Sequence, residues 1–264
     1  MIDRKIAPPI KDAIDYTLEL KPYELYSLDN NIPVYTIHAG AQEVIQLEFV
    51  FFAGNCYEQQ KGIAAATNFL LKNGTTKHNA FELNESFEYY GAYCNRSCYN
   101  ETAVISLHTL TRHIEKLLPV IQEMLTDATF PEDELDTYKQ NSKQRLKVNL
   151  QKAEFVAGRL IDSYVYGEQH PYGTYTIPEN LDNLTVEDIR NFYRKYYLNG
   201  QCIIFAAGNI PANLKQLLNA IFGKLAVSKP TNSSPNNKTS PAKERIYRVE
   251  NDPAAVQGAI RLAT

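Results

Sequence analysis

Five histidines and four cysteines are the side chains of this sequence best suited to bind a metal or act as nucleophiles. No two histidines stand four residues apart, the spacing that puts two metal ligands on one face of a helix. His78 and Glu82 have this spacing, but no third ligand accompanies them, so we interpret them as a surface ion pair. Cys94 and Cys98 fall on one expected strand, roughly 13 Å apart, which is too far for a disulfide or a shared metal. The spacing of these histidines and cysteines therefore favours packing roles and reduced thiols over a metal site.

Other common motifs and the composition exclude further classes of function. Neither a glycine-rich phosphate loop nor a G-x-S-x-G nucleophile elbow occurs. With 27 Lys and Arg against 30 Asp and Glu, the chain lacks the basic excess that favours a nucleic-acid partner. No apolar run is long enough for a membrane span or a signal peptide, which together with the sparse cysteines predicts a cytoplasmic protein. A leader removed before position 1 would leave a periplasmic location open.

The composition divides the 264 residues into three parts. Residues 1–226 have the mixed apolar and polar composition of one globular domain. Residues 227–244 are rich in proline, serine and asparagine, which is typical of a linker. Residues 245–264 resemble a strand, a turn and the beginning of a second strand. We therefore expect one complete domain, a linker and the incomplete start of a second domain.

The pattern of apolar residues predicts the elements of the first domain. Alternation typical of strands occurs at 32–37 and 44–52, which we expect to form a hairpin, and at 92–110, broken near Asn100. Helical spacing occurs at 62–72, 114–125 and 132–166, and a hydroxyl with an acid three residues on opens another helix at Thr185. A buried strand at 202–208 and a helix at 214–221 complete the domain. The predicted fold class is α+β, a largely antiparallel sheet with helices packed on one face.

A series of short phrases in this order resembles the amino-terminal domain of the M16 zinc metallopeptidases, the family of pitrilysin, insulinase and the mitochondrial processing peptidases. The resemblance covers about residues 24 to 226. The family's second domain begins with a strand similar to Gln257–Leu262. The phrases that carry the resemblance are Leu28–Tyr35, Gly54–Glu58, Gly62–Ala64, Leu70–Thr75, Gly91–Asn95, Tyr166–Gly173, Phe192–Tyr197 and Ala207–Asn209.

The chain departs from this family at the residues that bind zinc. Active members carry H-x-x-E-H on the helix after G-[ILV]-A, with two histidines as ligands and the glutamate as general base. Here Ala65, Asn68 and Phe69 hold these places, and none of them can bind zinc as histidine does or accept a proton from water. The family's third ligand is a glutamate some seventy or more residues further on. The stretch between Asp136 and Glu154 contains no acid; we expect its cations to face the old metal position and repel Zn²⁺, namely Lys139, Lys143, Arg145, Lys147 and Lys152.

The resemblance and this departure together predict a non-catalytic peptidase subunit or half. We expect it to pair with an active H-x-x-E-H subunit, or with a second copy or half, in a heterodimer that encloses a peptide chamber, and to be inactive on its own. No cofactor is expected in this chain; zinc is expected only in the active partner. The family's substrate-binding strand matches Asn95, Arg96 and Ser97, which we expect to bind an extended peptide at a sheet edge. The alternatives are an active zinc peptidase with atypical ligands and a scaffold or peptide-binding protein without a peptidase role.

Overall fold

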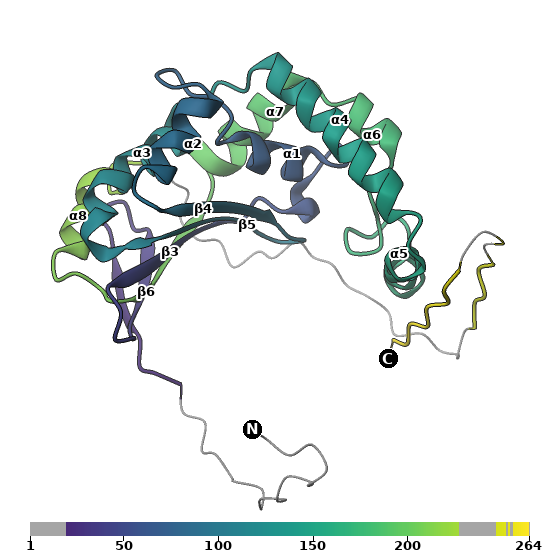
Figure 1. Cartoon of the computed structure of the whole chain (residues 1–264), viewed down its shortest axis with the longest axis horizontal. Helices are drawn as coiled ribbons and strands as arrows, with labels where there is room; N and C mark the ends of the chain where they lie inside the picture. Colours follow the sequence, from purple (N-terminus) through teal and green to yellow (C-terminus); the bar gives the residue numbers. More distant parts are fainter. Residues whose placement is uncertain (1–19, 227–246, 252, 254–255, 264) are drawn as a thin grey trace, which may run out of the picture.

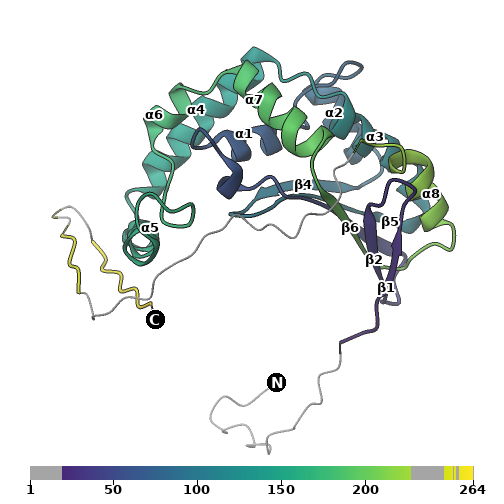
Figure 2. The ribbon, with the colours of Figure 1, turned by 180° about the vertical axis from the view of Figure 1, so that it is seen from behind.

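The protein forms a six-stranded sheet with helices on one side, as Figures 1 and 2 show. The structure is a computed structural model that describes residues 20–226, 247–251, 253 and 256–263. The strand order is β1-β2-β6-β3-β5-β4, and only the β2–β6 pair is parallel. The predicted α+β class with a largely antiparallel sheet is therefore confirmed. The strands are β1 (Glu24–Ser27), β2 (Pro33–His38), β3 (Val44–Phe51), β4 (Tyr93–Cys98), β5 (Ala103–Leu110) and β6 (Cys202–Gly208).

Strict alternation of burial along the strands sets which face of the sheet carries the core. In β3, Ile45, Leu47, Phe49 and Phe51 are buried, while the residues between them are partly exposed. Side chains that alternate along a strand point to opposite faces, so the helices cover the face that holds these four residues. The helices are α1 (Ile63–Leu70), α2 (Ala80–Glu88), α3 (Ile114–Thr126), α4 (Glu132–Asn149), α5 (Ala153–Tyr166), α6 (Pro178–Asp182), α7 (Val186–Tyr193) and α8 (Leu214–Phe222).

Strands β2 and β3 do not form the hairpin that we predicted from their sequence. Strand β6 lies between them, parallel to β2 and antiparallel to β3. The buried residues of β6 are Cys202, Ile204 and Ala206. Strand β6 therefore adds apolar side chains to the same core as β2 and β3. A strand buried between two others gains hydrogen bonds on both edges, which a simple β2–β3 hairpin would not supply.

Most other predicted elements are present, but strand β1 and the helices α2 and α6 were not predicted. The segment 132–166 forms two helices, and Thr185 accepts a hydrogen bond from the Asp188 N–H at 3.2 Å, as expected of a helix cap. Helix α2, which the sequence analysis missed, begins with a capping box between Asn79 and Glu82. Its apolar pattern is weak, because Leu83 and Phe87 are its only buried residues.

The parts of the chain beyond residue 226 add no further element among the residues described. The predicted linker at 227–244 lies outside the described residues. The described positions after 246 form neither of the two strands that we expected there. In the described part of the chain, no helix is both long enough and apolar enough to cross a membrane.

Candidate functional site

Helix α1 places the three residues that replace the zinc motif in three different environments. Ala65 lines a cavity and Phe69 is 37% exposed, whereas Asn68 is 1% exposed. The Asn68 Nδ2 donates to the Ser97 carbonyl of β4 at 2.8 Å, and its Oδ1 is buried without a hydrogen-bond partner among the described residues. Asn68 thus connects the helix to the strand.

Phe69 packs between a cation and an aromatic ring. Its ring centroid is 4.6 Å from the Arg96 guanidinium carbon and 5.1 Å from the Tyr138 ring of α4. Arg96 Nη1 also donates to the Phe69 carbonyl and, at 3.0 Å, to Asn73 Oδ1, so it caps the carboxyl end of α1. Arginine and tyrosine therefore surround the position at which the family has its second histidine.

Strand β4, which holds the predicted peptide-binding residues Asn95, Arg96 and Ser97, is an edge strand of the sheet. The Tyr99 N–H donates to the Thr102 carbonyl at 2.8 Å at the turn between β4 and β5. In an antiparallel pair, residues that exchange hydrogen bonds alternate with residues that do not. The register therefore directs the main chain of Tyr93, Asn95 and Ser97 to β5.

The same alternation leaves the N–H and C=O groups of Cys94, Arg96 and Cys98 at the free edge. Of the three predicted residues, only Arg96 thus offers its main chain to a peptide. The side chain of Arg96 lies against α1, as described above, and the Asn95 side chain is exposed. The sequence placed the edge strand correctly but could not show which residues face outward.

Two of the cations that we expected to face the old metal position, Lys139 and Lys143, contact α6 instead. Lys143 pairs with Asp182 of α6, and Lys139 donates to the Asp182 carbonyl at 3.5 Å and lies 3.9 Å from Asp136. The side of α4 that lines the cavity carries Tyr138, Ser142 and Leu146 instead. Because these residues recur every four positions, they form a neutral stripe on a helix that is strongly charged elsewhere.

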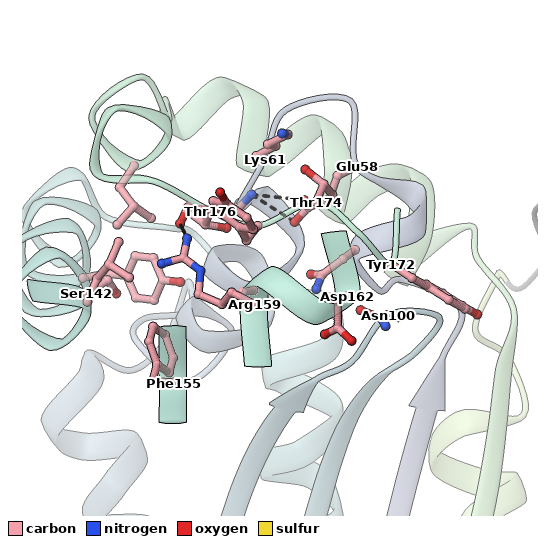
Figure 3. Close-up of a pocket in the computed structure, with 17 residues that line it drawn as sticks. Glu58, Lys61, Asn100, Ser142, Phe155, Arg159, Asp162, Tyr172, Thr174 and Thr176 are labelled. Atoms are coloured by element: carbon pink, nitrogen blue, oxygen red, sulfur yellow. Dashed lines mark hydrogen bonds between the residues drawn. The ribbon is translucent and has the colours of Figure 1, made fainter. Parts of the chain in front are cut away.

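A cavity of about 400 Å³ occupies the space between α1, α4 and α5, and Figure 3 shows it. Glu58 accepts hydrogen bonds from the N–H groups of Gly62 at 3.1 Å and Ala64 at 3.0 Å, which satisfies the amino end of α1. Burial raises the pKa of Glu58 to about 7, although these two hydrogen bonds lower it. A glutamate thus lies in the cavity, held against the backbone of α1.

The loop between α5 and α6 covers one side of the cavity. Tyr172 donates to the Glu101 carboxylate at the tip of the β4–β5 hairpin, and this hydrogen bond raises the pKa of Tyr172 to about 12. Arg159 of α5 stacks on Tyr175 at 4.0 Å. It also donates to the Thr176 carbonyl at 2.7 Å, as Figure 3 shows. Contacts of Tyr172 and Arg159 therefore hold the loop against the hairpin and α5.

The residues around the cavity do not fit a zinc ion. A catalytic zinc needs three protein ligands with nitrogen, sulfur or carboxylate donors. Ala65 has no donor atom, the Asn68 amide is turned to Ser97, and Ser142 and Leu146 supply no carboxylate from α4. Among the described residues, no group of three His, Cys, Asp or Glu side chains lies close enough to hold a metal. Zinc chemistry therefore has no ligand set here.

The remaining histidine and cysteine predictions have mixed outcomes. His78 pairs with Glu123 of α3 at 2.8 Å, so the predicted pair with Glu82 is wrong; Glu82 instead caps α2. Cys94 and Cys98 lie on one face of β4, and Cys94, Cys98 and Cys202 are free thiols. Burial raises the pKa of Cys94 to about 11 and that of Cys98 to about 12, so both are thiols at neutral pH.

Two family models match most of the chain. The model described as insulinase, peptidase family M16, matches residues 34–175, and the model described as the M16 inactive domain matches residues 183–263. The fold and the replaced motif thus define an M16 peptidase domain. The chain belongs to peptidase family M16.

Known relatives are similar at low identity. An uncharacterized zinc protease of Rickettsia felis is 22% identical over 192 residues, which are 71% of this chain and 46% of that protein. The probable mitochondrial-processing peptidase subunit beta of Schizosaccharomyces pombe is 26% identical over 218 residues, covering 80% of this chain and 47% of the relative. The chain therefore spans about half the length of the curated relatives it matches.

Solved structures share the fold. An M16 inactive domain from Pseudomonas fluorescens superposes with a TM-score of 0.73 at 22% identity, covering 84% of this chain and 54% of that one. The first half of the periplasmic protease PqqL from Escherichia coli gives a TM-score of 0.71 at 18% identity, covering 82% of this chain and 49% of that one.

Proposed function

We propose that this chain is a non-catalytic M16 subunit or half that pairs with an active H-x-x-E-H zinc peptidase around a peptide chamber. The observation that carries the proposal is the environment of Asn68, at the position of the family's general base. Its amide is 1% exposed and hydrogen-bonded to Ser97, so it holds the helix to the sheet. An amide cannot accept a proton from water at neutral pH, whereas a glutamate can.

The free edge of β4 is the part of the domain that would contact the peptide. An extended peptide adds to a sheet edge through main-chain hydrogen bonds, which need no metal and no catalytic side chain. The outward N–H and C=O groups of Cys94, Arg96 and Cys98 offer this pairing over one edge of the sheet. A domain that has lost its zinc ligands can thus still bind a peptide for its partner to cleave.

The names of similar proteins support a paired assembly. A relative from Schizosaccharomyces pombe is a probable subunit of the mitochondrial-processing peptidase, and a solved structure of the first half of PqqL has the same fold. A chamber enclosed between halves needs a second half, which we propose carries the intact zinc motif.

Reconstitution with a candidate partner tests the proposal. The chain is co-expressed with an M16 protein from the same genome that carries H-x-x-E-H, and hydrolysis of a quenched fluorescent peptide is measured with and without it. We expect activity to require both proteins and zinc to be found only in the partner by mass spectrometry. Stoichiometric zinc and peptidase activity in this chain alone would favour an atypical zinc peptidase. Activity of the partner that is unchanged without this chain would favour a scaffold.

Restoring the motif provides a second test. The triple variant Ala65→His, Asn68→Glu, Phe69→His regains two ligands and a base, but α4 still offers no carboxylate toward the cavity. We therefore expect no tight zinc binding in equilibrium dialysis. Stoichiometric zinc in this variant would show that another residue supplies the third ligand.

A further inference from the structure

Lys72 is a buried cation with no carboxylate partner in the part of the chain that the structure describes. It follows α1, is 8% exposed and places its Nζ 4.9 Å from the centroid of the Phe87 ring. Among the described residues, no carboxylate forms an ion pair or hydrogen bond with it. Burial lowers the pKa of Lys72, because a charged ammonium is less well solvated there than in water. Glu88 acts on it only at longer range.

Arg96 is a second cation at the carboxyl end of α1, next to which Lys72 follows in the sequence, and no carboxylate pairs with it in the described part of the chain. Its Nη1 donates to the Phe69 carbonyl and to Asn73, but its Nε is buried with no partner among the described residues. The positive charge of Arg96 contributes to the lowered pKa of Lys72, so the two charges act on each other. Two neighbouring cations repel, and an anion that contacts both would offset this repulsion.

The pair lies beside the free edge of β4. Arg96 belongs to that strand and offers its main chain outward, and Lys72 acts electrostatically on Cys94, the preceding outward position. A peptide paired with this edge would carry every second side chain toward the face of the sheet on which α1 and Lys72 lie. One of these side chains, or the carboxyl end of the peptide, would contact Lys72 and Arg96.

We propose that Lys72 and Arg96 form a carboxylate-binding site that selects peptides with an acidic group at this edge. The inference rests on the proposed function, since it needs a peptide on β4. The carboxylate comes either from an aspartate or glutamate side chain or from the carboxyl terminus of the peptide. A charge-assisted hydrogen bond to a partly buried ammonium is stronger than one between neutral groups, so it would favour such peptides over their amides.

Matched peptides test this selection in the full chain. The probes are fluorescein-labelled, strand-forming peptides of Val, Thr and Ser that carry glutamate at one scanned position, with glutamine counterparts, each as terminal acid and terminal amide. Anisotropy titrations measure their affinities. We expect one glutamate position, or the terminal acid, to bind at least about tenfold tighter than its neutral counterpart. The scanned position and the terminal form distinguish the two sources.

Substitutions test whether Lys72 causes the preference for acidic peptides. Lys72→Met keeps the packing on Phe87, so we expect it to remove the preference for the acidic peptide and leave the affinity for the neutral one within about twofold. Lys72→Arg should retain the preference, and Lys77→Met, at an exposed lysine five residues on, should not change it. If Lys72→Met does not fold, ¹³C-methylated Lys72 in the wild-type chain gives a second measurement. Its pKa should rise when the acidic peptide binds.

The outcomes separate this inference from the proposed function. Equal affinities for acidic and neutral peptides would overturn the carboxylate site and leave peptide binding at β4 in place. A preference that persists in Lys72→Met would also overturn the site. No binding of any probe would overturn the edge-strand part of the proposed function and this inference with it.

Discussion

The buried amide of Asn68 holds α1 to the edge strand through one hydrogen bond to the Ser97 carbonyl. Asn68→Ala removes the donor and leaves that carbonyl with one contact fewer in a buried place. We expect the free energy of unfolding to fall by about 1 to 3 kcal/mol. Urea denaturation measures the change.

Asn68→Asp refines this prediction. It keeps the shape of the side chain but puts a carboxylate against a carbonyl oxygen, so at neutral pH it should destabilise the fold more than alanine. Protonation restores a donor, so the deficit should shrink as the pH falls. The control is Asn84→Ala on α2, whose amide donates to a carbonyl of its own helix. Equal stability of Asn68→Ala and the wild type would contradict a structural role for Asn68.

The raised pKa of Glu58 predicts that the stability of the fold depends on pH. Its folded pKa of about 7 lies above the ordinary glutamate value of 4.5. Between these values the folded chain binds more protons than the unfolded chain, so this group's contribution to stability falls as the pH rises from about 4.5 to about 7. We expect the loss to be on the order of 1 to 3 kcal/mol.

Glu58→Gln removes this titration. The difference between wild type and variant in free energy of unfolding, measured by urea denaturation from pH 4.5 to 7.5, should therefore change over that window. The matched control is Glu85→Gln on the exposed side of α2. A difference that stays constant with pH would show that Glu58 is not held at the raised pKa.

At the scale of elements, the loop between α5 and α6 closes one side of the cavity. Tyr172 holds it to the hairpin through Glu101, and Gly173 lies so close to Gly167 that a Cβ atom at position 173 would be 2.2 Å from the Gly167 carbonyl oxygen. The loop is therefore compact and is joined to the sheet mainly at its tip.

Removing that contact should loosen the loop. Tyr172→Phe deletes the hydroxyl that donates to Glu101, and we expect faster amide hydrogen exchange in residues 168–176, with the sheet unchanged. Stability should fall by about 1 kcal/mol. Tyr99→Phe, at an exposed tyrosine in the same hairpin, is the control. If amide hydrogen exchange in residues 168–176 is unchanged in the Tyr172→Phe variant, Arg159 alone holds the loop.

At the scale of the whole molecule, β6 joins two parts of the sheet. Without it, β1 and β2 would have no contact with β3, β5 and β4 in the sheet. Its residues pair with positions far away in the sequence, such as Ile204 with Val34 and with Phe49. The sheet is therefore completed only when a late part of the chain has been inserted.

Substitutions at two neighbouring residues of β6 distinguish the contribution of core packing from that of strand propensity. Ile204 is 0% exposed in the core, whereas Ile203 is partly exposed on the other face. We expect Ile204→Ala to lower the free energy of unfolding by about 2 to 5 kcal/mol. Ile203→Ala, with the same change in strand propensity, should cost less than half as much. Equal losses in urea denaturation would mean that the outer face is covered in solution.

The sequence by itself determined most of the elements and the loss of the metal ligands. Helices and strands followed from apolar periodicity, because each periodicity reflects one buried face within a short segment. That Ala65, Asn68 and Phe69 cannot replace two histidine ligands and a glutamate base followed from side-chain chemistry, which does not depend on the fold. Helix α2 was missed because only two of its residues are buried.

Only the tertiary structure decided which segments meet. The insertion of β6 depends on pairing between residues about 170 positions apart, which local patterns do not encode. The face that α4 turns to the cavity depends on α6, whose Asp182 draws Lys139 and Lys143 away from it. The closeness of Lys72 and Arg96 depends on how α1 lies on the edge of the sheet. Contacts between distant segments are set by packing and long-range charge, which appear only once the chain has folded.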